Sequence, residues 1–134
     1  GSLGRRLLCH VSDIMHKDER TPKVSKQATV SEALLEMSRK GLGMTAIVDD
    51  QDQLLGIFTD GDLRRTLDKN IDIHTTAIES VMTVGGKTAN KHDLAAETLK
   101  LMDDFNINGV MVVDENNKLI GALNMHDLLR AGVV

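Results

Sequence analysis

The stretch Leu54-Leu55-Gly56-Ile57-Phe58-Thr59-Asp60-Gly61-Asp62-Leu63 occurs a second time, in altered form, as Leu119-Ile120-Gly121-Ala122-Leu123-Asn124-Met125-His126-Asp127-Leu128. The two copies lie 65 positions apart, and the same spacing pairs Met37 with Met102. Further upstream the spacing becomes 67, because Asp13-Ile14-Met15 matches Ser80-Val81-Met82. Such a change is typical of an insertion in a connecting loop. The chain therefore consists of two copies of a unit of about sixty residues, a size that buries too little surface alone.

Within each unit the hydrophobic period changes in a regular order. Apolar residues at helical spacing predict a helix over 30–40, and Thr29 and Glu32 before it have the capping-box pattern. Pro22 lies in an extended segment that fits an edge or a strand start. The remaining elements expected are strands over 45–48, 54–59, 87–89, 110–113 and 119–124, and helices over 60–67, 94–105 and 125–130. The predicted fold class is α/β, with two β-α-β-β-α repeats packed with pseudo-two-fold symmetry.

The composition excludes several classes of function. A net charge of −4 and the absence of Trp and Tyr argue against binding of nucleic acid, which favours basic surfaces and aromatic stacking. The sequence has neither an apolar run long enough to span a membrane nor a signal peptide, so we expect a soluble, cytoplasmic protein. A single cysteine, Cys9, cannot form an internal disulfide, and the five histidines lack the spacing of a metal site.

The duplicated unit, with an apolar strand that ends in Thr-x-x-Asp, resembles the tandem cystathionine-β-synthase-type (CBS) domain pair, or Bateman module. The resemblance extends over nearly the whole chain. Its two ends, at residues 3–15 and 126–134, are similar to the C-terminal half of bacterial arabinose-5-phosphate isomerases of the sugar isomerase (SIS) type. On this basis residues 1–10 are expected to be a linker from a SIS domain, 11–70 the first CBS repeat and 71–134 the second.

The resemblance implies that this chain is a regulatory fragment of an enzyme and is not itself catalytic. The parent would convert ribulose 5-phosphate to arabinose 5-phosphate for Kdo (3-deoxy-manno-octulosonate), a sugar of lipopolysaccharide and capsules. The implied partners are the SIS catalytic domain of the same polypeptide and a second copy of the module, bound through CBS helices in a parent that is a tetramer. The alternative is an oligomerisation module of the same enzyme that binds no ligand. An independent enzyme is the least favoured class, since no Ser/His/Asp, Cys/His or paired-carboxylate arrangement is evident.

The strongest candidate site residues are Thr59 and Asp62. A strand that ends where a helix begins exposes amide donors and the positive end of the helix dipole, which favours a phosphate group. Asp62 is expected to accept the hydroxyls of a ribose, and Arg64 and Arg65 to contact a phosphate. The competing interpretation is that Thr59 is a helix cap and the arginines a solvated face. The resemblance adds contacts to a base from Lys23, Val24, Gly43, Met44 and Thr45.

The second unit carries a weaker form of the motif. Asn124 replaces the threonine, Asp127 remains, and His126 stands where the first unit has Gly61. We therefore expect two unequal nucleotide sites, with the stronger one at Thr59 and Asp62. His126 either titrates beside a bound phosphate or is an exposed histidine. The other four histidines, His10, His16, His74 and His92, are expected at the surface. No cofactor is expected, and the regulatory ligand is either an adenosine nucleotide (AMP or ATP) or the cytidine-linked sugar CMP-Kdo.

Overall fold

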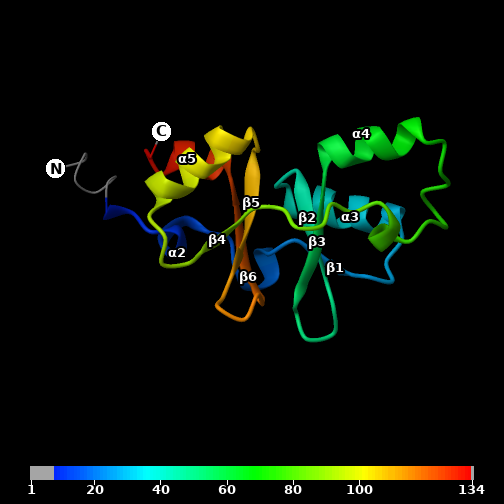
Figure 1. Cartoon of the computed structure of the whole chain (residues 1–134), viewed down its shortest axis with the longest axis horizontal. Helices are drawn as coiled ribbons and strands as arrows, with labels where there is room; N and C mark the ends of the chain where they lie inside the picture. Colours follow the sequence, from blue (N-terminus) through cyan, green and yellow to red (C-terminus); the bar gives the residue numbers. More distant parts are fainter. Residues whose placement is uncertain (1–7, 134) are drawn as a thin grey trace.

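The structure is a computed structural model that describes residues 8–133, traced in Figure 1. Most of the linker expected over 1–10 therefore lies outside the described residues. The first unit contains α2 (Val11–Ile14), the 3-10 turn η1 (Asp18–Arg20), β1 (Lys23–Ser25), α3 (Val30–Lys40), β2 (Met44–Val48), β3 (Leu54–Thr59) and α4 (Asp60–Asp68). The second contains the 3-10 turn η2 (Ile78–Ser80), β4 (Thr88–Asn90), α5 (Ala95–Phe105), β5 (Gly109–Val113), β6 (Leu119–Asn124) and α6 (Met125–Arg130).

Each unit forms a three-stranded mixed sheet, with strand orders β1-β2-β3 and β4-β5-β6. The first strand of each sheet runs parallel to the middle strand, and the last strand runs antiparallel to it. The predicted α/β class and the β-α-β-β-α order are confirmed, with element ends that differ from the expected ones by at most one residue. Pro22 immediately precedes β1, which is an edge strand of its sheet, as expected for a residue without an N–H donor.

The segment that leads into each unit packs on the sheet of the other unit. The first lead (residues 9–16) pairs with the second unit through bridges from His10 to Leu94 and from His16 to Ala122. The second lead (residues 77–83) pairs with the first unit, where Thr83 bridges Ile57. Val11 is fully buried in the core of the second unit, and Ile78 in that of the first. The two units are therefore interlocked by exchanged leads.

Glycine at two matched positions permits the leads to approach the strands. A Cβ atom on Gly56 would lie 2.6 Å from Met82 Sδ and 2.8 Å from the carbonyl oxygen of Thr83. A Cβ atom on Gly121 would lie 2.7 Å from the carbonyl oxygen of His16. Any side chain at either position would push the lead off the sheet.

A third core lies between the two sheets, which stand side by side in Figure 1. Met44 and Ala46 of β2 pack there with Met111 of β5 and Ala122 of β6. Gly109 belongs to the same contact, since a Cβ atom on it would lie 2.6 Å from Met44 Sδ. Burying a side chain of the size of methionine contributes about 1.5–3 kcal/mol, so this core holds the sheets in a fixed arrangement. The position of the strand ends relative to one another follows from it.

Candidate functional site

The Thr59 junction, at which β3 passes into α4, brings several of the predicted residues together. Thr59 is the N-cap of α4 and lies opposite Met44 in the β2–β3 ladder, with Thr45 next along β2. Gly43 precedes β2, and a Cβ atom on it would lie 3.4 Å from Asp60 Oδ2. Thr45 is fully buried and Met44 nearly so, so their side chains belong to the packing beneath the junction.

Asp62 is the buried centre of this junction, with a side chain only 6% exposed. Its Oδ2 accepts hydrogen bonds from Thr59 N at 3.0 Å and from Thr59 Oγ1 at 3.2 Å. Its Oδ1 accepts from Arg65 Nη2 at 2.6 Å and from Thr83 Oγ1 at 2.8 Å. Both carboxylate oxygens therefore have partners, and one of the partners belongs to the second lead.

The Asn124 junction, where β6 passes into α6, repeats this arrangement with different partners. Asp127 Oδ2 accepts from Asn124 N at 2.8 Å. Asp127 Oδ1 contacts Arg130 Nη2 at 2.5 Å and His16 Nε2 at 2.8 Å. The Asp127 side chain is only 4% exposed. Burial would raise the pKa of this carboxyl, but hydrogen bonds from the Asn124 amide, His16 and Arg130 outweigh burial and hold the pKa below its usual range.

His16 and Thr83 occupy matched positions, because the leads repeat at a spacing of 67. Each reaches across to the aspartate of the other unit. The expectation that His16 is an ordinary surface histidine is therefore wrong, since its side chain is 22% exposed and bound to a buried carboxylate. The signal that identifies it is the 67-residue spacing, applied one residue beyond Met15 and Met82. His10, His74, His92 and His126 are exposed.

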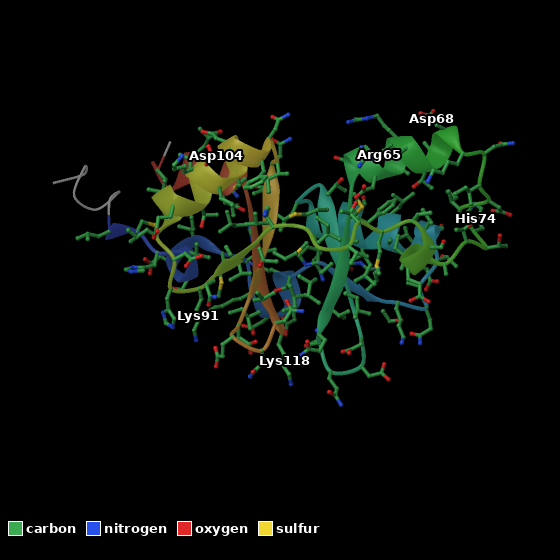
Figure 2. The ribbon with its side chains drawn as sticks, in the orientation of Figure 1. Arg65, Asp68, His74, Lys91, Asp104 and Lys118 are labelled. Atoms are coloured by element: carbon green, nitrogen blue, oxygen red, sulfur yellow. The ribbon has the colours of Figure 1, made fainter. Side chains whose placement is uncertain are left out.

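Lys23 and Val24 do not join the Thr59 junction. The Lys23 ammonium group pairs with Asp52 in the β2–β3 turn at 2.9 Å, and the Lys23 amide donates to Glu36 of α3. Val24 packs against the core beneath α3. Both residues line a cavity of about 470 Å³ between β1 and α3. Of the two arginines, Arg64 is exposed, whereas Arg65 contacts Asp62 from α4, where Figure 2 labels it.

Arg65 and Arg130 are the partners of the two buried aspartates that a ligand can replace. The Arg65 side chain is 69% exposed and that of Arg130 is 62% exposed, although each contacts a buried aspartate. Each aspartate is buried, and a buried polar group that loses a partner costs about 1–3 kcal/mol, so a guanidinium group leaves its carboxylate only where another donor replaces it. A ligand with hydroxyl donors can then take its place, while the backbone amide and the lead residue keep the carboxylate oriented.

Comparison with known proteins places the whole arrangement in one family. The sequence pattern of the family described as CBS domain matches residues 11–69 and 78–134. The chain is 55% identical over 134 residues to the arabinose 5-phosphate isomerase KdsD of Pseudomonas aeruginosa and 52% identical to that of Escherichia coli. All of this chain takes part in both alignments, but it spans only 41% and 40% of the length of these relatives.

Solved structures agree with this assignment. The CBS domain pair of protein MJ0100, in complex with 5'-methylthioadenosine and S-adenosyl-L-methionine, has a TM-score of 0.82 and 27% identity, and the match covers 92% of this chain and 94% of that one. The protein CBSX2 in complex with AMP has a TM-score of 0.78 at 22% identity, over 93% and 96% of the two chains, and shows a shared fold. No helix within residues 8–133 is long and apolar enough to cross a membrane.

Proposed function

The chain belongs to the CBS-domain family as a tandem pair of CBS repeats, and from that premise we propose that it is the nucleotide-responsive regulatory module of an arabinose-5-phosphate isomerase. The parent would interconvert ribulose 5-phosphate and arabinose 5-phosphate for Kdo synthesis. Its SIS catalytic domain would be the partner on which the module acts, in the cytoplasm. The basis is the identity of 52–55% to relatives that bear the name of this isomerase.

The observation that carries the regulatory role is the pair of buried carboxylates at the two strand-to-helix junctions. Asp62 and Asp127 are each held by donors from both units. A ligand that replaces Arg65 or Arg130 therefore contacts groups positioned by both repeats, and its binding favours one arrangement of them. Unequal affinity for two arrangements is what an allosteric module requires.

The proposed ligand carries a ribose and a phosphate. In the Thr59 junction, Thr59 and Arg65 are suited to a phosphate and Asp62 to ribose hydroxyls, with Arg64, Gly43, Met44 and Thr45 around them. In the Asn124 junction, Asn124 and Asp127 have the corresponding roles, with His126 at the start of α6. Lys23 and Val24 line the separate cavity beside β1 and remain candidates for a base contact. AMP, ATP and CMP-Kdo all contain the two groups that these residues recognise.

Thermal unfolding in the presence of AMP, ATP, CMP and CMP-Kdo tests the proposal. A ligand that binds only the folded chain and is present at a hundred times its dissociation constant adds roughly 2.7 kcal/mol of stability. We expect at least one of the four to raise the unfolding temperature of the 134-residue chain. If none of them does, the nucleotide role is wrong and the oligomerisation role takes its place.

The alternative role as an oligomerisation module rests on a separate observation. Within residues 8–133, each of the helices α3, α4, α5 and α6 leaves a large apolar side chain more than half exposed: Leu35 of α3, Leu67 of α4, Phe105 of α5 and Leu129 of α6. A symmetric dimer formed through these helices would cover them. The mass of the chain in solution tests this role independently of any ligand, since a strictly monomeric chain would contradict it.

A further inference from the structure

A cavity of about 360 Å³ lies between the first lead, η1 and the C-terminal end of α3. It is lined by His16, Glu19, Arg20, Arg39 and Lys40. Three of these side chains are permanently cationic and only one is a carboxylate. A volume of this size is at the lower end of the range of small-molecule sites, which is about 300–1,000 Å³. The lining therefore favours a small anionic group.

The cations of this cavity are only partly neutralised by the protein. Arg20 is exposed and forms no salt bridge with the carboxylates of residues 8–133. Arg39 is 71% exposed, and its Nη1 atom donates to Glu36 Oε1 at 3.5 Å, the long limit of a hydrogen bond. Lys40 is closer to Glu36, at 2.8 Å. Cations are common in the last turn of a helix, which accounts for Arg39 and Lys40. Arg20 ends the short turn η1, so its charge comes from a different segment of the chain.

Glu36 shares its charge among several groups. Burial would raise the pKa of its carboxyl, but hydrogen bonds from Lys40 and from the Lys23 amide, together with the two nearby cations, lower the pKa overall. The carboxylate is therefore ionised and mainly compensates Lys40. The guanidinium groups of Arg20 and Arg39 remain for an incoming anion.

The second unit has no equivalent of this cavity lining. The connection from lead to first strand covers 17–22 in the first unit but only 84–87 in the second, which locates the change of spacing from 67 to 65. The longer connection forms η1 and supplies Arg20. In the second unit the matched helix end carries Asp104 and Phe105 in place of Arg39 and Lys40. Lys87 lies over the Phe105 ring, 4.3 Å from its centroid. Figure 2 labels Asp104 on α5.

One side chain joins the cationic cavity to the Asn124 junction. His16 lines the cavity and also contacts Asp127 Oδ1 through its Nε2 atom at 2.8 Å. His16 is therefore the residue that the cavity lining and the Asn124 junction share. The Thr59 junction has a threonine, Thr83, at the matched position.

We propose that this cavity is the phosphate subsite of the module and that Arg20 and Arg39 bind the phosphate of a ligand entering the Asn124 junction. The inference rests on the proposed nucleotide-responsive function and adds to it the residues, and the half of the module, that recognise the charged group. It places the stronger site in the unit with Asn124 and not in the unit with Thr59. Bidentate contacts of arginine to phosphate supply the affinity.

Calorimetric titration of the 134-residue chain with AMP, adenosine, CMP and cytidine tests the assignment. Arg20→Ala and Arg39→Ala should each weaken binding of the nucleotides about tenfold or more, the scale of a charged hydrogen bond. They should change binding of the nucleosides less than twofold, because a nucleoside lacks the phosphate. Lys91→Ala is the charge-matched control, since Lys91 is exposed in the β4–α5 connection and does not line the cavity, and it should leave all four affinities unchanged.

The remaining outcomes separate this inference from the proposed function. Nucleotide binding that survives both arginine variants but is lost in Asp62→Ala would overturn the inference and leave the proposed function intact.

If the unsubstituted chain binds no nucleotide, an NMR titration with inorganic phosphate tests the anion site alone. Saturable changes in the chemical shifts of the Arg20 and Arg39 amides would support an anion site on its own, provided that the change at Arg39 is lost in Arg20→Ala. The absence of such changes in the unsubstituted chain would overturn the site. Unchanged unfolding temperatures of the two exposed-arginine variants verify that they fold.

Discussion

Asp62 and Asp127 determine the structure of the two junctions because each carboxylate serves two purposes. One oxygen closes the capping box at the start of a helix, and the other accepts from a lead residue of the opposite unit. Asp127 is therefore both a local cap and a long-range link between residues 111 positions apart. A substitution at Asp127 or at its lead partner is expected to affect the contact between the units as well as the helix.

The lowered pKa of Asp127 predicts an acid-sensitive part of the stability. The usual pKa of an aspartate is about 3.9 in an unfolded chain. The pKa of Asp127 in the folded chain lies below this value. Its ionised carboxylate therefore contributes fully to the free energy of unfolding above the unfolded-state pKa, and this contribution is lost as the pH falls through the folded-state pKa. Urea unfolding between pH 7 and pH 2 should show that Asp127→Asn loses less stability in acid than the unsubstituted chain. Asp50→Asn, at an exposed turn position, is the control, and equal acid dependence in all three proteins would contradict the prediction.

Replacing His16 by alanine should destabilise the fold. Asp127 Oδ1 would keep Arg130 but lose its lead donor, and a buried polar group that loses a partner costs about 1–3 kcal/mol. His10→Ala is the matched control, because His10 belongs to the same lead and its side chain is 47% exposed. Chemical unfolding should place the His10 variant near the unsubstituted chain. Equal losses for both variants would mean that the lead, and not the bond to Asp127, accounts for the effect.

Among the elements, the two leads depend on the glycines beneath them. Gly56→Ala and Gly121→Ala should each destabilise the chain by about 1–3 kcal/mol, the cost of overpacking, because the new methyl group overlaps the backbone of the lead. Gly61→Ala in α4 is the matched control. Its Cβ atom would lie 3.6 Å or more from its neighbours, and alanine favours a helix over glycine by about 1 kcal/mol. Thermal unfolding should therefore shift down for the first two variants and up for the third, and a uniform direction would refute the packing argument.

The elements that the sequence predicts well are those with local causes. Thr29 and Glu32 form the expected capping box of α3, and Met37 and Met102 are buried as the helical period predicts. The exchange of leads was not predicted, because which sheet a lead joins depends on contacts between units and not on its own pattern. His16 was missed for the same reason. The cationic cavity also requires η1, and no periodicity indicates that the insertion forms a wall of a cavity.

At the scale of the whole molecule, the duplication produces two similar frameworks with different chemistry. The exchanged leads and the core between the sheets make the units one interlocked body. One junction keeps the threonine of the motif, and the other has the cationic cavity beside it. We therefore expect a ligand that is recognised by its phosphate to bind at only one of the two junctions. Binding of a ligand at one junction alone would make the two repeats unequal and so change their relative arrangement.

Removing this module from the parent isomerase should preserve turnover and abolish the response to nucleotide. In the proposed role the module acts through its ligand site, so its effect on the reaction has to come from a difference in ligand affinity between two arrangements of the parent. The test compares the full-length parent, the parent truncated immediately before Leu3 of this chain, and the full-length Arg39→Ala variant. Conversion of ribulose 5-phosphate is measured with and without the nucleotide that binds most tightly.

We expect all three proteins to be active. The nucleotide should change the activity of the full-length parent, should require a higher concentration to do so in Arg39→Ala, and should have no effect after truncation. If the truncated enzyme responds to the nucleotide as the full-length parent does, the ligand acts on the catalytic domain and the regulatory role of the module is wrong.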